Sequence, residues 1–428
     1  MMSVKKEQSA PSNEHVLSDH GTLRRILDAN GDACYVMDEQ RYADNITGLL
    51  ELFGAHYGRI AVGHSYKTNY IPQLCLVAHN SGAYAEVVSQ MEYDLAIRLG
   101  IAPERIILNG PVKDDALLRD ALFAGVMLNV DSMGEADRVM AIAQAHPERS
   151  FGMGARLNFR MEGLRRSRFG IDTDGDAPER LLAALEEVPN LRLRGIHCHL
   201  GGDRTGQAYA HRTERMMELA RRLFPNGNPD YIDIGGGFAG QMPSSLAAQL
   251  PYPPPSMAEY ATAVAGTMAR SFDPSNGPEL IVEPGMSILS DVLHFVCEVS
   301  SLKEVAGEHH AITTGSIYNI KPTLHKMDMP IEVVPVPGGK GRKARWVISG
   351  YTCMEIDVMH AALETALAPN DLLVCSNVGA YTVVLKPPFI KPAPAIVSVQ
   401  KDGSFSVVKR AETLDDILAT YRWQAPNI

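Results

Sequence analysis

The sequence lacks long apolar runs and has no surplus of positive charge. No run approaches the roughly 20 apolar residues that a membrane-spanning helix needs, and the N-terminus lacks the apolar stretch of a signal peptide. The formal charge is -10 at pH 7 and the pI is near 5.8, so no broad basic field can hold a phosphate backbone. We therefore expect a soluble, cytoplasmic protein without membrane or nucleic-acid partners. Residues 1–20 are predicted to form a disordered tail.

Cysteine is scarce and unpaired. The six cysteines stand singly, without the C-x-x-C pairs or the density of a disulfide scaffold, so most should be small buried apolar residues. The H-C-H run at 197–199 resembles a metal clip. On a strand only its two histidines face the same side, and the sequence shows no third ligand, so we predict no metal site.

What is present is the composition of a large folded chain, with 428 residues, 45% hydrophobic and 21% charged. Eight short β-branched runs alternate with amphipathic stretches over about 240 residues, which is typical of a (β/α)8 barrel. An open doubly wound sheet is the alternative. The expected strands are 59–66, 84–88, 105–109, 126–130, 151–158, 193–200, 231–235 and 280–284. The expected helices are 42–53, 92–99, 114–121, 133–146, 178–185, 212–223 and 257–269.

The pattern changes beyond residue 287. β-rich runs separated by Gly and Pro turns predict an all-β sandwich or barrel there. The runs are 291–305, 331–336, 344–351 and 395–400. We therefore expect a barrel domain over residues 40–286 and a β domain that combines residues 287–428 with a helix and strand from 21–39.

Reactive residues follow the predicted barrel strands. Lys67, Arg156, His199, Gly235–Gly237 and Glu283 all stand at or near strand ends. Each alone is better explained as a solvated charge, a structural histidine or a turn. In a β/α barrel, however, all these strand ends meet at one face, where the active site lies. Their joint placement predicts a site.

These residue types suit one cofactor. Glycines without Cβ let backbone amides approach a phosphate, and a lysine whose amine is held neutral can form a Schiff base. A carboxylate on the last strand can keep a pyridine nitrogen protonated, and a histidine can stack on the ring. Together they indicate pyridoxal 5'-phosphate.

Ordered motifs carry a family resemblance over roughly residues 30–425. The chain resembles the pyridoxal-phosphate decarboxylases of fold type III, the group of ornithine and diaminopimelate decarboxylases. The matching motifs are H-S-Y-K-T-N (64–69), R-L-N (156–158), S-R-F-G-I (167–171), H-C-H-L-G (197–201), D-I-G-G-G-F (233–238), E-P-G (283–285), G-Y-T-C-M-E-I-D (350–357) and V-G-A-Y (378–381).

The resemblance implies roles for single residues on the cofactor side. Lys67 resembles the lysine that binds the cofactor, and Glu283 resembles the partner of the pyridine nitrogen. His199 matches the histidine that stacks on the ring, Gly235–Gly237 the phosphate loop, and Arg156 the arginine near the ring.

The resemblance also implies a shared site. Tyr381 matches a phosphate-contacting tyrosine, and Cys353 matches the cysteine that the partner subunit contributes and that handles the proton at Cα. The protein would therefore be a homodimer with two sites, each releasing CO2 from an amino-acid substrate.

Several positions on the substrate side depart from the family pattern. Met286 replaces the arginine of E-P-G-R, Met354 replaces the acid that reads a distal amine, and Gly202 replaces a serine that contacts phosphate. These changes leave two methionines where the family has charged side chains, which gives an adaptable apolar surface.

A weaker alignment covers N-I-K-P-T-L-H-K (319–326). Lys321 stands where diaminopimelate enzymes carry arginine, His325 where they carry tyrosine, and Lys326 where diamine-producing enzymes carry aspartate. A distal ammonium would meet like charge there. We therefore expect a substrate with an anionic or bulky distal group, and ornithine and lysine become poor candidates. meso-Diaminopimelate stays an open alternative, which these departures from the family pattern disfavour.

Two other functions stay open. An amino-acid racemase could use the same barrel, although the G-x-x-C-x-x-x-D arrangement around Cys353 favours decarboxylation. A non-catalytic regulatory binding protein is the other, although such a descendant would be free to lose Lys67, Glu283 or Cys353, and all three are present.

Overall fold

The computed structural model describes residues 14–161, 163, 165–385 and 388–422. The chain divides into two compact units. One contains Tyr42–Gln241 and Leu250–Leu289, and the other contains Met242–Gln249, the described residues up to Arg41 and those from Ser290 onward. The predicted barrel domain, 40–286, resembles the first unit except for the segment 242–249.

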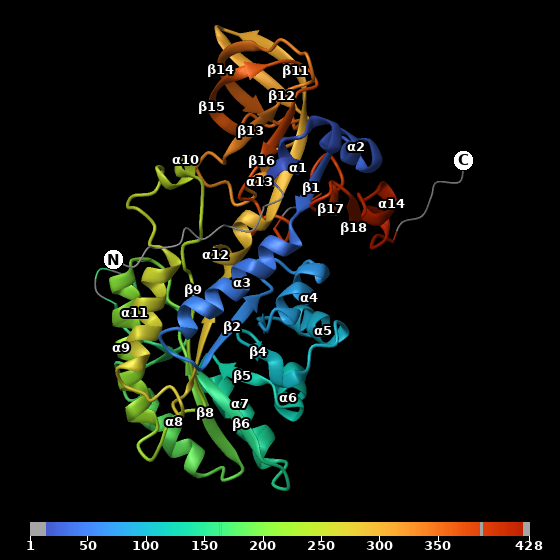
Figure 1. Cartoon of the computed structure of the whole chain (residues 1–428). Coiled ribbons are helices and arrows are strands. Elements are labelled where there is room, and N and C mark those ends of the chain that lie inside the picture. Colours follow the sequence, from blue (N-terminus) through green and yellow to red (C-terminus); the bar gives the residue numbers. More distant parts are fainter. Residues whose placement is uncertain (1–13, 162, 164, 386–387, 423–428) are drawn as a thin grey trace, which may run out of the picture. The chain divides into compact units, whose positions relative to one another are not determined.

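The first unit is a closed barrel of eight parallel strands (Figure 1). Strand β10 pairs with β2 and so closes the ring, which confirms the predicted barrel and excludes the open sheet. All eight predicted strands are present. They are β2 (Ile60–Ser65), β3 (Tyr84–Val87), β4 (Ile106–Leu108), β5 (Met127–Val130), β6 (Phe151–Asn158), β8 (Leu191–His197), β9 (Tyr231–Gly236) and β10 (Glu279–Glu283). The short β7 (Ile171–Asp172) pairs with β6.

Helices cover the outside of the barrel (Figure 1). The seven predicted helices are present as α3 (Glu39–Gly54), α5 (Gln90–Arg98), α6 (Asp115–Ala124), α7 (Met133–Gln144), α8 (Ala177–Glu186), α9 (Gly206–Leu223) and α11 (Met257–Ala269). The unit also contains η1 (Pro103–Arg105) and α12 (Gly285–Leu289). The prediction missed α4 (Pro72–Asn80), because its first turn follows Ile71, which offers no side-chain cap.

A layer of side chains fills the barrel. It consists of Ala61, Ile107, Met127, Tyr231 and Ile281. The large Tyr231 ring needs glycine on β8 and β6, because a Cβ at Gly195 would lie 2.6 Å from the ring and one at Gly154 would lie 2.0 Å from its hydroxyl. Packing here explains two glycines that carry no chemistry.

The second unit is built on a nine-stranded sheet, which confirms the all-β prediction. Strand β1 (Ala33–Met37) pairs antiparallel with β11 (Leu293–Val305) and parallel with β17 (Ala395–Val399), so an N-terminal strand joins the C-terminal sheet as expected. The other strands are β12 (Glu308–Thr313), β13 (Ile331–Val334), β14 (Arg342–Ser349), β15 (Val358–Leu367), β16 (Leu372–Cys375) and β18 (Phe405–Lys409).

Short helices complete this unit. They are α1 (Glu14–Ser18), α2 (His20–Asn30), α10 (Ser244–Ala247), η2 (Ser290–Val292), α13 (Ile317–Ile320) and α14 (Leu414–Leu418). The tail predicted over residues 1–20 is too long, because α1 is helical and buries Val16 and Leu17 in the core of this unit. Residues 1–13 of that tail lie outside the described residues.

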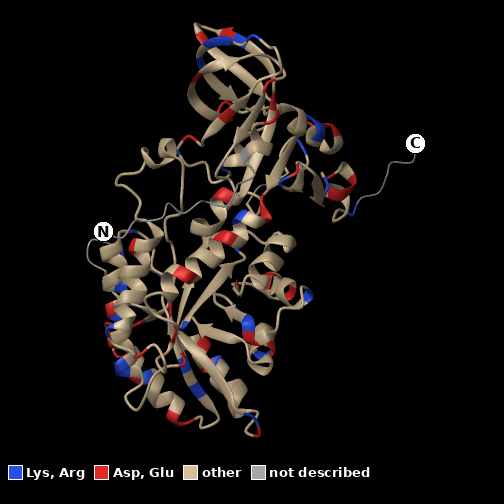
Figure 2. Ribbon diagram, in the orientation of Figure 1, with Lys and Arg blue, Asp and Glu red and all other residues tan. Residues whose placement is uncertain are grey.

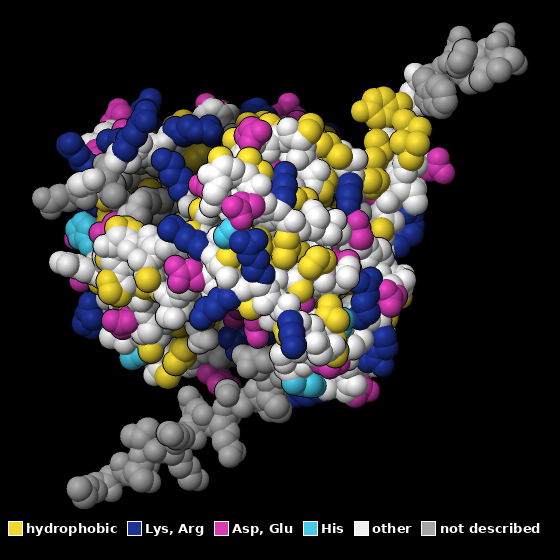
Figure 3. Space-filling model, turned by 90° about the horizontal axis from the view of Figure 1, so that it is seen from above, with side chains coloured by type: hydrophobic (Ala, Val, Ile, Leu, Met, Phe, Trp, Pro, Cys, Tyr) yellow, Lys and Arg dark blue, Asp and Glu magenta, His cyan; other side chains and the backbone are white. Residues whose placement is uncertain are grey.

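Charged residues lie mainly on helices and loops (Figure 2), and on the face shown in Figure 3 basic and acidic side chains are interspersed. Among the described residues, no helix combines the length and the hydropathy needed to cross a bilayer. Five cysteines are buried as predicted, and Cys353 is exposed.

Candidate active site

Lys67 lies in the turn that follows β2. The turn is fixed by two backbone bonds, from Tyr66 N to Glu86 O (2.9 Å) and from Thr68 N to Ser65 O (3.0 Å). The lysine side chain is about one-third exposed, and its Nζ forms an ion pair with the fully buried carboxylate of Glu86 on β3. The structure thus gives Lys67 a proton acceptor that the sequence motifs did not reveal.

Asn109, directly after β4, joins two buried carboxylates. Its amide donates to Glu86 Oε1 (3.1 Å) and to Glu283 Oε1 (2.6 Å), while its own oxygen accepts from Asn129 Nδ2 (2.9 Å). Tyr231 donates to Asn129 and completes the chain of bonds. The network therefore runs from Lys67 to Glu283 across the carboxyl ends of four strands.

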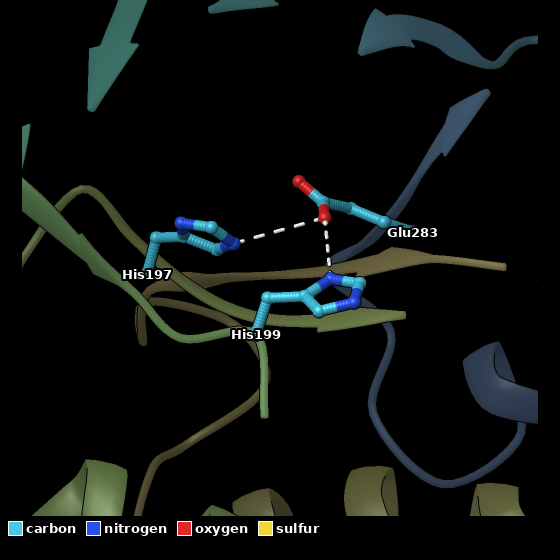
Figure 4. Close-up of side chains that lie close together, drawn as sticks. All are labelled: His197, His199 and Glu283. Atoms are coloured by element: carbon cyan, nitrogen blue, oxygen red, sulfur yellow. Dashed lines mark ion pairs between the residues drawn. The ribbon is translucent and has the colours of Figure 1, made fainter. Parts of the chain in front are cut away.

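His197 and His199 both point toward Glu283 (Figure 4). They stand at the end of β8, two residues apart, and so face the same side. His197 Nε2 lies 3.7 Å and His199 Nδ1 3.5 Å from Glu283 Oε2. His199 Nδ1 also accepts a hydrogen bond from Gly236 N (3.2 Å), so this nitrogen carries no proton and its approach to Glu283 is a contact rather than a hydrogen bond.

Burial sets the charge of these groups. It lowers the pKa of His197, although the neighbouring Glu283 carboxylate opposes this shift. Burial alone would raise the pKa of Glu283, but the adjacent His197 imidazole, together with the charge of Lys67, outweighs burial and holds that pKa well below its usual range. Glu283 is thus an ionised carboxylate inside the barrel.

The pKa of Asp233 on β9 is shifted in the opposite direction. This residue is fully buried, and burial followed by the charge of Glu283 raises its pKa well above the usual range. Asp233 Oδ1 accepts a hydrogen bond from Gly235 N (2.8 Å). Burial beside an ionised Glu283 therefore favours the protonated form of Asp233.

The glycine run Gly235–Gly237 was predicted to follow the strand, but Gly235 and Gly236 are the last two residues of β9 and only Gly237 follows it. The run has a packing role. A Cβ at Gly235 would lie 2.3 Å from Cys198 O, and one at Gly236 would lie 2.1 Å from Glu283 O. Gly235 and Gly237 have φ of 71° and 89°, which favour glycine. The loop thus lies close against the ends of β8 and β10.

Arg156 on β6 is buried beside His199. Its guanidinium pairs with Asp131 (2.9 Å), donates to the backbone oxygen of His199 (3.2 Å) and lies 4.8 Å from the centre of the Phe169 ring. These contacts fix the His199 backbone. In the first unit, the structure therefore brings together Lys67, Arg156, His199, Gly235–Gly237 and Glu283 at one end of the barrel.

Cys353 lies in the second unit, on an exposed loop before β15. Asp357 shapes this loop, since its buried carboxylate accepts from Ser316 Oγ (3.0 Å), Ile317 N (2.7 Å) and Thr352 N (3.1 Å). A Cβ at Gly350 would lie 2.2 Å from that carboxylate. The first and last residues of G-x-x-C-x-x-x-D therefore build the loop that presents the cysteine.

Lys321 is buried, and it is already paired. Its Nζ donates to Met327 O (3.0 Å) and lies 3.7 Å from Asp328 Oδ1. Burial and then Lys321 lower the pKa of the half-buried His325, so this histidine is neutral near pH 7 and offers hydrogen bonds rather than charge. Lys326 is exposed.

The remaining predicted residues lie in separate places. Met354 is 39% exposed and contacts the Tyr318 hydroxyl, whereas Met286 is half-buried on α12 of the barrel unit. Gly202 is exposed with φ of 114°. Tyr381 adopts φ of 55°, a conformation that costs a non-glycine residue about 1 kcal/mol or more.

The two histidines have a third partner that the sequence pattern did not reveal. Among the described residues, His197, His199 and Glu283 place ligand-type atoms within 4.8 Å of one another, so a third partner does exist. The same three groups also suit a protonated heterocycle, because an ionised carboxylate binds a ring N–H. The absence of a metal stays a prediction.

Comparisons with known proteins agree with this geometry. The family model of the pyridoxal-dependent decarboxylases, pyridoxal binding domain, matches residues 43–290. The diaminopimelate decarboxylase of Methanothermobacter thermautotrophicus is 26% identical over 94% of this chain and 95% of its own length. An uncharacterized protein of Sinorhizobium fredii, y4yA, is 28% identical over 84% of this chain and 86% of its own.

Solved structures share the fold. Diaminopimelate decarboxylase from Methanocaldococcus jannaschii, in complex with L-lysine, has a TM-score of 0.83 at 21% identity and covers 94% of both chains. The arginine decarboxylase of Paramecium bursaria Chlorella virus has a TM-score of 0.70 at 21% identity, over 86% of this chain and 96% of its own. The chain belongs to the fold type III pyridoxal-phosphate-dependent decarboxylases, lyases that act on amino acids.

Proposed function

We propose that the chain decarboxylates an amino acid with a distal carboxylate, and that Lys67, His199, Gly235–Gly237 and Glu283 bind the pyridoxal phosphate. One observation carries the proposal. The amine of Lys67 and the carboxylate of Glu283 belong to one buried hydrogen-bond network, through Glu86 and Asn109, at the carboxyl ends of the barrel strands.

The residues fit this cofactor. Glu283 Oε2 and both ring nitrogens of His197 are buried and have no hydrogen-bond partner among the described residues. Buried polar atoms without partners are costly, so they indicate a ligand with a donor for the carboxylate, such as a protonated pyridine nitrogen. The side chains of Lys67 and His199 are both about one-third exposed, so both can be reached.

The chain's own residues prepare this chemistry. Bound pyridoxal phosphate supplies the electron sink that accepts the electron pair left when CO2 departs. Glu86 accepts a hydrogen bond from Lys67 Nζ and so holds the amine that would bind the cofactor. The carboxylate of Glu283, whose pKa is held low, would stabilise a positive charge on the ring nitrogen, and the raised pKa of Asp233 limits the repulsion between these two neighbouring groups.

Arg156 and Tyr381 complete the proposed cofactor contacts. Arg156 holds the backbone of His199 and so the face on which the ring would lie. The left-handed backbone of Tyr381 is the kind of strain that accompanies functional positions.

We propose that the enzyme is a homodimer in which Cys353 of the partner subunit returns the proton at Cα. Its exposure on a loop braced by Asp357 supports this role, because a catalytic thiol must be reachable. Subunit mixing tests it. Neither Lys67→Ala nor Cys353→Ala alone should be active, but their mixed dimers should regain activity because one of the two sites has both residues. No recovery in a verified mixed dimer would contradict a shared site.

The substrate proposal rests on Lys321 and Asp328. A distal carboxylate can pair with Lys321, and a distal ammonium can pair with Asp328, which the sequence alignment did not include. Met354 and Met286 remove charged contacts that the family pattern offers. meso-Diaminopimelate, whose distal end carries both charges and which the names of the relatives indicate, is therefore the first substrate to test.

A substrate panel tests the function. Purified protein with pyridoxal phosphate is incubated with meso-diaminopimelate, glutamate, 2-aminoadipate, lysine and ornithine, and released CO2 is measured. We expect CO2 from substrates with a distal carboxylate and little from lysine or ornithine. Lys67→Ala should abolish it, while the exposed control Lys401→Ala should not. Exchange of the Cα proton in deuterated water without CO2 would indicate a racemase instead. A cytoplasmic location stays part of this proposal.

A further inference from the structure

Arg212 is a buried cation without an acidic partner. It lies on α9, and only 1% of it is exposed. Among the described residues no carboxylate comes within 4.0 Å of its guanidinium, and its Nε has no hydrogen-bond partner. Burying an unpaired charge is unfavourable unless an anion or ordered dipoles compensate it.

The contacts of Arg212 lie on two loops of the candidate site. Its guanidinium donates to Leu200 O (2.7 Å), directly after His199, and lies 3.5 Å from Gly236 O. Tyr209, one turn earlier on α9, donates to the same Gly236 oxygen (2.9 Å) and lies under the Arg212 guanidinium, 4.3 Å from the ring centre. Two side chains of α9 therefore hold both loops in place through backbone oxygens.

These bonds orient peptide groups. In a trans peptide the carbonyl and the following amide point in opposite directions. Because Arg212 draws the Leu200 carbonyl toward α9, the amide of Gly201 points away from the helix. A loop whose carbonyls face a buried cation and whose amides face outward suits an oxyanion.

We propose that Arg212 is a positioning residue for the cofactor phosphate. It braces the loops at Leu200 and Gly236 and adds a positive charge behind them, at a site where Gly202 and Met286 have removed a hydroxyl and a cation of the family pattern. The inference rests on the proposed phosphate position at Gly235–Gly237. It assigns to α9 a role that neither the motifs nor the site residues given above include.

The test compares pyridoxal 5'-phosphate with pyridoxal, which lacks the phosphate. Dissociation constants for both are measured by absorbance titration of the full-length apoprotein. Arg212→Met should weaken binding of the phosphorylated form by about tenfold to a hundredfold, because the loops lose the charge-assisted bonds to Leu200 O and Gly236 O. Binding of pyridoxal should stay unchanged. Arg212→Lys should lie between. The control is Arg215→Met, since Arg215 pairs with Glu218 on the outer side of the same helix.

Two further variants separate the possible outcomes. Tyr209→Phe removes only the hydroxyl on Gly236 O and should lower the preference for the phosphorylated form even if Arg212→Met does not fold. Gly237→Ala perturbs the proposed phosphate loop itself. An unchanged preference in Tyr209→Phe and in every Arg212 variant that folds, together with a loss in Gly237→Ala, would overturn the role of α9 and leave the proposed function standing. No change in any variant would overturn both.

Discussion

Asn109 should be one of the most sensitive positions in the barrel. It is 3% exposed and makes three side-chain hydrogen bonds, two of them to the buried carboxylates of Glu86 and Glu283. Asn109→Ala removes all three. A hydrogen bond to a charged group contributes about 1.5–3 kcal/mol and a neutral one about 1 kcal/mol, so we expect a loss of about 4–7 kcal/mol in the free energy of unfolding.

The size of this loss makes the result decisive. A domain is stable by about 5–15 kcal/mol, so Asn109→Ala should lose a large share of the barrel's stability. Urea unfolding followed by far-UV circular dichroism reports mainly on the barrel, because most of the helices lie in that unit. The fluorescence of the buried Trp346 reports on the other unit. The far-UV midpoint should fall much more than the fluorescence midpoint.

The control is Asn228→Ala, an exposed asparagine in the same unit, which should leave both midpoints in place. Asn109→Ala should also weaken cofactor binding, since Glu86 and Glu283 lose their common donor. A loss below about 1 kcal/mol would refute the reasoning, because it would mean that water replaces Asn109 at little cost.

Two further substitutions test packing and charge in the barrel unit. Gly195→Ala places a methyl group against the Tyr231 ring, and this overpacking should lower the free energy of urea unfolding by about 1–3 kcal/mol. The control Gly227→Ala should leave the stability unchanged, because a Cβ there would have no atom within 4 Å. Equal unfolding midpoints for the two variants would contradict the packing argument. Lys113→Met leaves the buried Glu135 without its 2.8 Å ion partner and should lower the free energy of unfolding by about 3–5 kcal/mol. The double variant Lys113→Met with Glu135→Gln should recover much of this stability. A double variant no more stable than Lys113→Met would show that loss of the ion pair is not the cause.

The residues predicted from the sequence share one property, namely that each stands in a motif at the end of a strand. Lys67, His199 and Glu283 follow apolar runs that identify the strands, and the barrel rule then places them on one face. The fold could be predicted for the same reason, because eight alternations of strand and helix leave few architectures. At these positions the apolar pattern of the strands and the known location of barrel active sites point to the same residues.

The network around these residues could not be predicted, because it depends on pairs that only barrel closure creates. Asn109 and Glu283 are 174 residues apart, and the apolar pattern around Asn109 marks it merely as the end of a strand. Asp233 is part of a recognised motif, yet its protonation follows from burial beside Glu283. Arg212 lies in a helix with three other arginines nearby, and only packing shows that it is the buried one.

Asp233→Asn tests whether Asp233 is protonated at neutral pH. An acid whose folded pKa lies above its unfolded value, near 3.8, favours folding fully only below that value, and the contribution is lost as the pH rises toward the folded pKa. Asparagine keeps the acceptor for Gly235 N and offers N–H to Glu283, but it does not titrate. The variant should therefore gain stability relative to the original chain between pH 4 and pH 8.

The measurement is urea unfolding of both proteins at several pH values in that range, with Asp94→Asn, a substitution at an exposed position, as the control. If the free energy of unfolding of the variant minus that of the original chain rises with pH, the folded chain binds a proton at Asp233 which the unfolded chain has lost. A flat or falling difference would show that Asp233 is ionised. Two buried negative charges would then lie side by side, and Glu283 would need a stronger cationic partner than the described residues provide.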